Sequence, residues 1–170
     1  MDILIRPETP ADYAAIYMLT EAAFQEMEHA DGDEQELACK LRKQANFRPE
    51  LSLVAELDKQ IVGHVLFTEI PIGASRALCV GPLAVLPSLQ GQGIGAALMQ
   101  AGHKAGHALG FSLCVLVGYA AYYSRFGYEP AGQHGILLPV EAPEACKMVK
   151  FLEACGKSVR GVAAFPPELI

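Results

Sequence analysis

Apolar residues in the first half of the chain recur with periods that predict a short strand, two helices and a hairpin. Residues 2–6 resemble a strand, and Thr9-Pro10-Ala11-Asp12 is typical of a helix start, because Thr9 can cap free amides and Pro10 suits the first turn. Spacings of three and four then predict one buried helical face, made by Tyr13, Ile16, Tyr17, Thr20, Ala23, Phe24 and Met27. A shorter helix is expected over 33–44, and 51–57 with 61–70 should form a β-hairpin.

Charge-poor strands around one long helix are predicted for the second half. Residues 77–86 form a third strand, in which Pro82 cannot donate to a neighbour and predicts an irregularity. A helix over 93–109 should stop at Gly110, followed by a strand over 111–117 and a short helix over 121–126 that ends at Gly127. Weaker strand signals follow at 136–139, 147–152 and 162–165. Because no repeat or linker interrupts this order, we expect a single α/β domain over residues 1–170.

Composition narrows the class of protein. The 170 residues carry 13 Lys and Arg against 19 Asp and Glu, a net charge of -6 that argues against nucleic-acid binding. Five cysteines without a Cys-x-x-Cys pair fit neither a disulfide framework nor a structural zinc site. The N-terminus lacks a signal peptide, and the uncharged stretches 77–103 and 105–124 are broken by Pro, Gly and polar residues. We therefore expect a reduced, cytoplasmic protein without membrane contact.

The segment 83–96 carries the most chemical information. A strand leads into a glycine-rich turn that opens directly into a helix, whose first N–H groups and dipole favour an anion. Glycines at 91, 93 and 95 would let a diphosphate approach these amides, which predicts a nucleotide-type cofactor, although the glycines could also serve only a tight turn. Gly91-x-Gly93-x-x-Ala96 formally matches the dinucleotide fingerprint, but no acidic residue follows before Glu129. A Walker motif is absent as well.

Gln90-x-x-Gly93-x-Gly95, with Leu83-Ala84-Val85 before it and 122–128 after it, closely resembles the GNAT superfamily of N-acetyltransferases, particularly the YhbS-like predicted acetyltransferases. The resemblance implies a mixed, mostly antiparallel central sheet flanked by helices. It also implies that acetyl-CoA is the co-substrate and that no metal is needed. The order of strands and helices expected from the periodicity agrees with that fold.

The resemblance further implies a role for each residue of this segment. The pyrophosphate of acetyl-CoA would bind the amides of Gln90, Gly91, Gln92, Gly93, Ile94, Gly95 and Ala96, and the pantetheine arm would pair with Leu83, Ala84 and Val85. An amine would attack the thioester directly, with a backbone amide near Val85 stabilising the oxyanion. Tyr123, four residues before Gly127, would protonate the leaving thiolate. Tyr122, Phe126 and Tyr128 are expected to pack, and packing alone is also open for Tyr123.

Several positions depart from the family pattern or leave its chemistry open. Gln92 stands where the family often has a basic residue, and Gly118-Tyr119 where it often has an asparagine that touches the cofactor. No carboxylate lies on strand 77–86, so Glu69 is the first candidate side chain for the general base, followed by Glu21 and Glu26, with a water chain to solvent as an equal alternative. His103 and His107 are expected on the polar side of their helix rather than at a metal.

An acidic segment is the remaining candidate feature. Residues 21–36 hold seven Asp and Glu and no Lys or Arg. In the family this connection borders the acceptor entrance, so we hypothesise attraction of a small cationic amine, with a solvated loop as the alternative. A non-catalytic acyl-CoA-binding or regulatory module and a protein lysine or N-terminal acetyltransferase are the alternative functions. Edge strands near the C-terminus are available for pairing in a homodimer.

Overall fold

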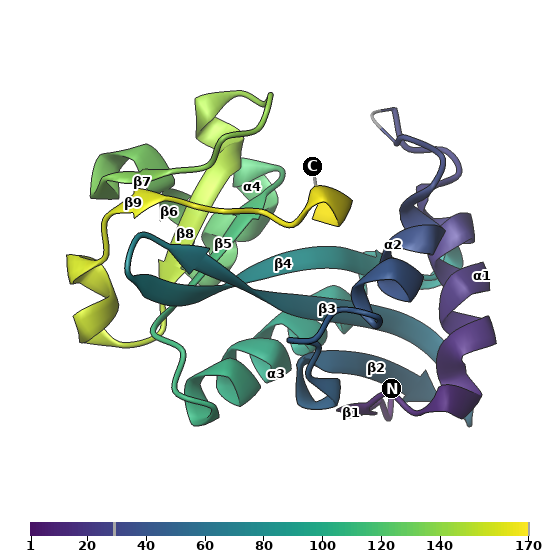
Figure 1. The fold of residues 1–170 in the computed structure, drawn as a ribbon. Coiled ribbons are helices and arrows are strands. Elements are labelled where there is room, and N and C mark those ends of the chain that lie inside the picture. The colour runs from purple at the N-terminus through teal and green to yellow at the C-terminus, as the bar shows by residue number, and fades with distance from the viewer. Residues whose placement is uncertain (29, 170) are drawn as a thin grey trace. The chain divides into compact units, whose positions relative to one another are not determined.

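The computed structural model contains both helices and strands and describes residues 1–28 and 30–169 (Figure 1). The helices and strands are β1 (Leu4–Pro7), α1 (Tyr13–Phe24), α2 (Glu34–Leu41), β2 (Ser52–Leu57), β3 (Gln60–Ile72), β4 (Ser75–Val85), α3 (Ile94–Ala108), β5 (Leu113–Val117), α4 (Ala120–Tyr123), β6 (Glu129–Pro130), β7 (Ile136–Leu137), β8 (Lys147–Phe151) and β9 (Gly161–Val162). Short 3₁₀ turns join several of them. This order follows the prediction, with β6 and the shortness of β7 and β9 as the main differences.

A seven-stranded sheet has the order β1-β2-β3-β4-β5-β8-β6, and β7 pairs with β9 in a separate two-stranded sheet. Neighbours β1–β2, β2–β3, β5–β8 and β6–β8 are antiparallel, whereas β4–β5 is parallel. The predicted α/β class with a mixed, mostly antiparallel sheet is therefore confirmed. By internal contacts the chain divides into two compact units, residues 1–68 with 81–102 (unit 1) and residues 69–80 with 103–170 (unit 2). The single domain over 1–170 stays a prediction.

Unit 1 is built on the predicted hairpin. Asp58 and Lys59 have φ values of 50° and 65°, which is the left-handed geometry of a tight two-residue turn between β2 and β3. Helix α1 buries Ile16, Leu19, Thr20 and Ala23. The predicted burial is wrong for two residues of this face. Tyr13 is 37% exposed, and Met27, which lies beyond the end of α1, is 44% exposed.

The first part of α3 lies on the face of unit 1 opposite to α2 (Figure 1). Gly102 makes this close approach feasible, because a Cβ at that position would overlap the buried ring of Phe67 on β3. The backbone of α3 at Gly102 therefore lies close to the Phe67 side chain of β3.

Unit 2 has its own apolar core between β5, β8 and the C-terminal segment. Its buried members include Ile70, Leu113, Val115, Ile136 and Val149. The segment after β9 is tied to the end of β3, since Ala163 bridges Ile72. In the described parts of the chain, no helix has the length and apolar character needed to cross a bilayer.

Candidate functional site

A glycine-rich loop joins β4 to α3 and forms a candidate anion-binding site within unit 1. Gly91 and Gly93 have φ values of 76° and 87°, and a Cβ at either position would meet no atom within 4 Å. The Gly93 carbonyl accepts the first helical hydrogen bond from the Ala97 N–H at 3.0 Å, so Gly93 caps the helix. The N–H groups that open a helix have no intrahelical acceptor, and the dipole of this 15-residue helix adds partial positive charge there. The loop can therefore bind an anionic group through its backbone.

The structure brings the predicted cofactor-binding residues together. The Gln90 side chain donates from Nε2 to the Val85 carbonyl at 3.1 Å, which ties the loop to the end of β4. Ala84 is 2% exposed and packs against Leu19 and Ala23 of α1, and Ile94 is equally buried. Ala84 and Ile94 can therefore offer only backbone groups to a ligand, whereas Gln90 is exposed on the surface.

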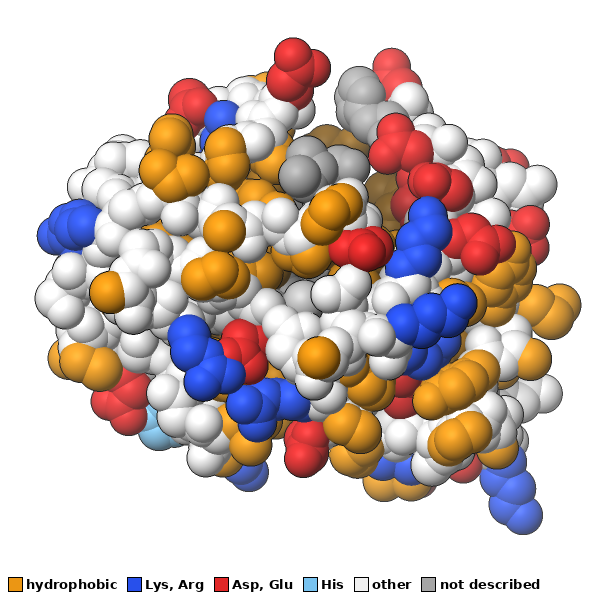
Figure 2. Space-filling view, viewed as in Figure 1, with side chains coloured by type: hydrophobic (Ala, Val, Ile, Leu, Met, Phe, Trp, Pro, Cys, Tyr) orange, Lys and Arg blue, Asp and Glu red, His pale blue; other side chains and the backbone are white. Residues whose placement is uncertain are grey.

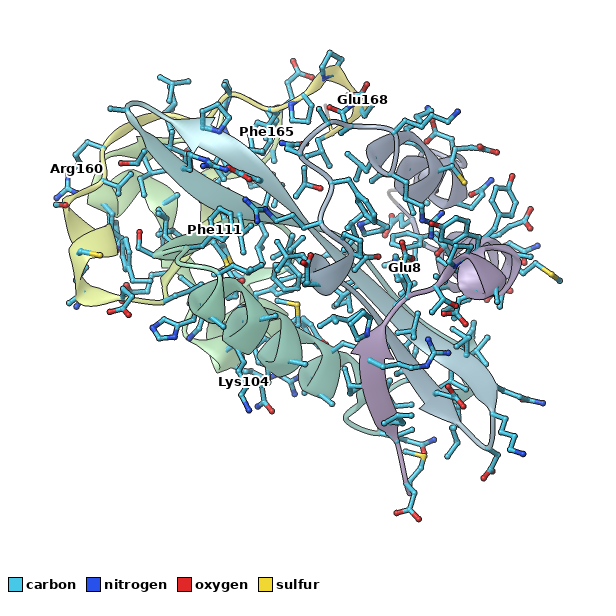
Figure 3. The ribbon with its side chains drawn as sticks, turned by 60° about the horizontal axis from the view of Figure 1, so that its bottom comes forward. Glu8, Lys104, Phe111, Arg160, Phe165 and Glu168 are labelled. Carbon is cyan, nitrogen blue, oxygen red and sulfur yellow. The ribbon has the colours of Figure 1, made fainter. Side chains whose placement is uncertain are left out.

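Side-chain charge adds little to this loop. No Asp or Glu occurs between Glu69 and Glu129, and the bases in that stretch are Arg76, Lys104 and Arg125. Lys104 points away from α3 into solvent (Figure 3). Since Gln92 is neutral, any anion bound by the loop would be held mainly by amides and the helix dipole.

Tyr123, the predicted proton donor, belongs to unit 2. It ends α4, and the chain continues through a 3₁₀ turn to Gly127, whose φ of 88° terminates the turn. Burial, together with the neighbouring Tyr122 hydroxyl, raises the pKa of Tyr123 above its ordinary value. The phenol therefore carries its proton at neutral pH.

Glu69, the predicted general base, also belongs to unit 2. Its side chain is 7% exposed and pairs with Arg76, which is itself 64% exposed. The carboxylate thus already has a cationic partner, whereas a general base is usually free to accept the proton of its substrate. The prediction that Glu69 takes the amine proton is untested by this arrangement and stays a prediction.

His103 contradicts the expectation of a solvated helix face. It is 8% exposed, and its Nε2 lies 2.7 Å from the Tyr128 hydroxyl. The buried face of α3 includes Met99, four residues before His103, which is fully buried, whereas Leu109 is 38% exposed. Spacing from Met99 could have identified His103 as buried. His107 is exposed and contacts Glu153, so the two histidines have different partners.

A buried ionic cluster in unit 1 was missed by the sequence analysis. Glu8, in the connection between β1 and α1 (Figure 3), accepts two hydrogen bonds of 2.8 Å from Arg42 after α2. His64 of β3 lies 3.5 Å from Glu8 and 2.9 Å from the Ser52 hydroxyl. Burial opposes the charged form of Glu8, but hydrogen bonds from Arg42 and His64 outweigh it and lower the pKa to about 2. Burial lowers the pKa of His64.

This cluster fixes the end of α2 against the sheet of unit 1. The Arg42 guanidinium also stacks on the Tyr13 ring of α1 at 3.9 Å. A second link joins the two helices, because the Tyr17 hydroxyl donates to Glu36 at 2.6 Å. The sequence offered no spacing signal for these contacts, since they join residues far apart in the chain.

The acidic segment connects this pair of helices. Its exposed carboxylates gather where α1 passes into α2 (Figure 2), and they belong to Glu21, Glu26, Glu28, Asp31 and Asp33. A cavity of about 600 Å³ opens beside them, lined by both acidic and apolar side chains that include Met18, Glu21, Phe24, Met27 and Glu34. The lining combines negative charge with hydrocarbon surface. Among the described residues, no group of three or more His, Cys, Asp or Glu could hold a metal.

Comparison with known proteins gives consistent matches. Residues 48–130 match the family model of the acetyltransferase (GNAT) domain. The chain is 35% identical over 136 residues to the uncharacterized N-acetyltransferase YjhQ of Escherichia coli strain K12, covering 75% of each chain. A GNAT family acetyltransferase from Brucella melitensis, solved in complex with acetyl-CoA, is 32% identical over 99% of both chains with a TM-score of 0.83. YhbS from E. coli, solved in complex with CoA, is 29% identical with a TM-score of 0.87, over 98% of this chain and 91% of that chain.

Proposed function

The chain belongs to the GNAT family of N-acetyltransferases, and from this premise we propose that it transfers an acetyl group from acetyl-CoA to a primary amine by direct attack in a ternary complex. The loop before α3 is the observation that carries the proposal. Gly91 and Gly93 keep its surface open, and the N–H groups at the helix start favour a diphosphate. The relatives from B. melitensis and E. coli were solved with acetyl-CoA and CoA, which supports this ligand.

The proposed chemistry needs one proton donor and one proton acceptor. The amine nitrogen attacks the thioester carbonyl carbon, and collapse of the tetrahedral intermediate breaks the C–S bond. Tyr123, protonated at neutral pH, gives its proton to the leaving thiolate. A backbone amide near Val85 stabilises the oxyanion. The proton of the attacking amine passes to Glu69 or to water. Both acceptors are proposed because the Glu69 carboxylate is already paired with Arg76.

We propose further that the acceptor is a small cationic amine with a carbon skeleton. The acidic segment in unit 1 would concentrate cations by long-range attraction. The cavity beside it adds Met18, Phe24 and Met27, which suit methylene groups. A polyamine or an aminoalkyl compound combines these two properties.

An acetyl-CoA turnover screen across amine classes tests the proposal. Polyamines and other small diamines should be acetylated fastest, and Tyr123→Phe should bind acetyl-CoA as the parent does while losing about 100-fold in kcat. Acetylation only of lysine-bearing or N-terminal peptides would move the acceptor to proteins. Binding of acetyl-CoA without turnover on any class would instead establish a non-catalytic acyl-CoA-binding module.

A charge-neutralised variant tests attraction by the acidic segment. The three acids to change are exposed and have no side-chain partner in the described structure, which keeps the fold intact: Glu21→Gln, Glu26→Gln and Glu28→Gln. Glu34 and Glu36 are avoided, because Glu34 accepts from the Gly32 N–H and Glu36 from Tyr17. The variant should raise KM for a cationic acceptor and flatten its salt dependence.

A control variant that loses the same number of negative charges elsewhere separates attraction by the acidic segment from an effect of net charge. Three exposed acids elsewhere in the chain provide it: Asp2→Asn, Glu50→Gln and Glu141→Gln. The control should leave KM close to the parent value. Equal KM values for the two triple variants would contradict the role of the segment.

A further inference from the structure

The ring of Tyr123 lies directly against the backbone of Gly118, immediately after β5. A Cβ at Gly118 would be 2.5 Å from Cε2 and 3.0 Å from Cδ2 of that ring. Gly118 is not among the glycines with a positive φ, so its backbone conformation would suit other residues. The space occupied by Tyr123, rather than backbone geometry, is therefore what requires glycine here.

Tyr128 contacts the Tyr123 ring as well. The two ring centroids are 6.0 Å apart with planes at 73°, which is an edge-to-face arrangement. Tyr128 is 2% exposed, and its hydroxyl is held by the buried His103 Nε2 at 2.7 Å. Burial, assisted by the positive charge of Lys150, lowers the pKa of His103 to about 4, so the imidazole is neutral at neutral pH. The pair therefore fixes the Tyr128 ring without placing a charge beside Tyr123.

We propose that Gly118 and the Tyr128–His103 pair are positioning residues that hold the Tyr123 phenol in one orientation for proton donation. The proposal rests on the proposed function, because it takes Tyr123 as the proton donor. A donor that samples several orientations is correctly placed for only part of the time, so loss of its supports lowers the rate of the chemical step. Loss of these supporting residues should not change the contacts made by the cofactor loop of unit 1. The contact with the Tyr123 ring thereby gives a physical reason for glycine at residue 118, where the chain departs from the family pattern.

A double-mutant cycle distinguishes positioning from general stabilisation. Tyr128→Phe removes the hydroxyl bonded to His103 and retains the ring, and we expect about a tenfold loss of kcat with KM for acetyl-CoA unchanged. In a Tyr123→Phe background the same substitution should have no further effect, because the proton donor is already missing. Tyr13→Phe, at a half-exposed tyrosine of α1, is the control and should keep the parent kcat.

Gly118→Ala provides an independent arm, because its methyl group must displace the Tyr123 ring. It should also lower kcat about tenfold, and only when Tyr123 is present. Gly132→Ala is its control, since a Cβ there would meet nothing closer than the Glu144 carboxylate at 3.8 Å. Thermal melts of all variants show which of them remain folded at the assay temperature.

Each outcome of these experiments either supports or contradicts the positioning role of Gly118 and the Tyr128–His103 pair. An unchanged kcat in Tyr128→Phe, or equal losses with and without Tyr123, would overturn the positioning role and leave the acid assignment intact. Full activity in Tyr123→Phe alone would overturn the acid assignment in the proposed function, and the positioning role with it. If Gly118→Ala fails to fold, the Tyr128→Phe cycle still gives one of these answers.

Discussion

Gly93→Ala tests the acetyl-CoA loop most directly, and Gly110→Ala is its matched control. Gly93 precedes α3 with φ at 87° and Gly110 follows it with φ at 93°, and at both positions an added Cβ would meet no atom within 4 Å. Alanine at either position therefore costs only its left-handed backbone conformation, about 1–2 kcal/mol. For a chain of this size each kcal/mol lowers Tm by about 2–4 °C, so both variants should melt roughly 2–8 °C below the parent.

Only Gly93→Ala should also weaken the binding of acetyl-CoA. Its methyl group would stand beside the N–H groups at the start of α3, in the open space that a diphosphate needs. Loss of one hydrogen bond to a charged group costs about 1.5–3 kcal/mol, which is roughly a 10- to 150-fold increase in Kd. Isothermal titration calorimetry with acetyl-CoA measures this increase, and thermal melts of both variants measure the shared backbone cost.

The comparison of the two variants decides whether the loop reasoning is right. Similar melting temperatures with a Kd raised only in Gly93→Ala would support amide binding of the pyrophosphate. Parent-like Kd values in both variants would refute it, because the methyl group at residue 93 would then occupy space that the cofactor does not use.

Three other substitutions or conditions test packing and buried polar groups within the two units. Arg42→Met leaves the buried Glu8 carboxylate without its guanidinium and should destabilise the fold by about 3–5 kcal/mol in urea unfolding, whereas adding Glu8→Gln should restore most of that loss; no recovery would contradict the pairing. His103 binds its proton more weakly in the folded chain than its usual pKa of 6.5, with a folded pKa of about 4, so its contribution is present above pH 6.5 and is lost as the pH falls toward 4. The free energy of unfolding should therefore drop by roughly 3 kcal/mol between pH 7 and 4, and the drop should be smaller in His103→Gln. Gly102→Ala would overlap the buried Phe67 ring and should cost about 1–3 kcal/mol, an effect that Phe67→Leu should partly relieve; an unchanged urea midpoint in Gly102→Ala would contradict the close approach.

Patterns with a fixed short-range spacing were predicted well from the sequence. The hairpin turn between β2 and β3, the end of α3 shortly before Gly110 and the loop from Gln90 to Gly93 depend on residues within a few positions of one another. Turn geometry and helix ends are local properties, so a single sequence contains the information they need. The same holds for the family motif, which is one compact run of residues.

Contacts between distant residues were not predictable in this way. Glu8 and Arg42 are 34 positions apart, and His103 and Tyr128 are 25 apart. Glu8, Arg42 and His103 are polar and therefore suggested exposure, and only the fold reveals that a partner compensates their burial. His103 is an example, since it was expected on the polar side of its helix and is instead buried with its Nε2 at 2.7 Å from the Tyr128 hydroxyl.

The two proposed ligand-binding features differ in the range of the forces they would use, and this explains why the sequence defines one more clearly than the other. Under the proposal, amides in the loop before α3 contact a phosphate, so their geometry would be strict, and the spacing of Gly91 and Gly93 marks it in the sequence. The acidic segment would act through charges that remain effective over about 8–10 Å at physiological salt, so many arrangements of carboxylates would attract a cation equally well. Residues 21–36 hold seven of the 19 acidic residues, and the other 12 are outnumbered by the 13 Lys and Arg of the chain. The net charge of -6 is therefore a property of one segment, and it can suggest the sign of an acceptor but not its shape.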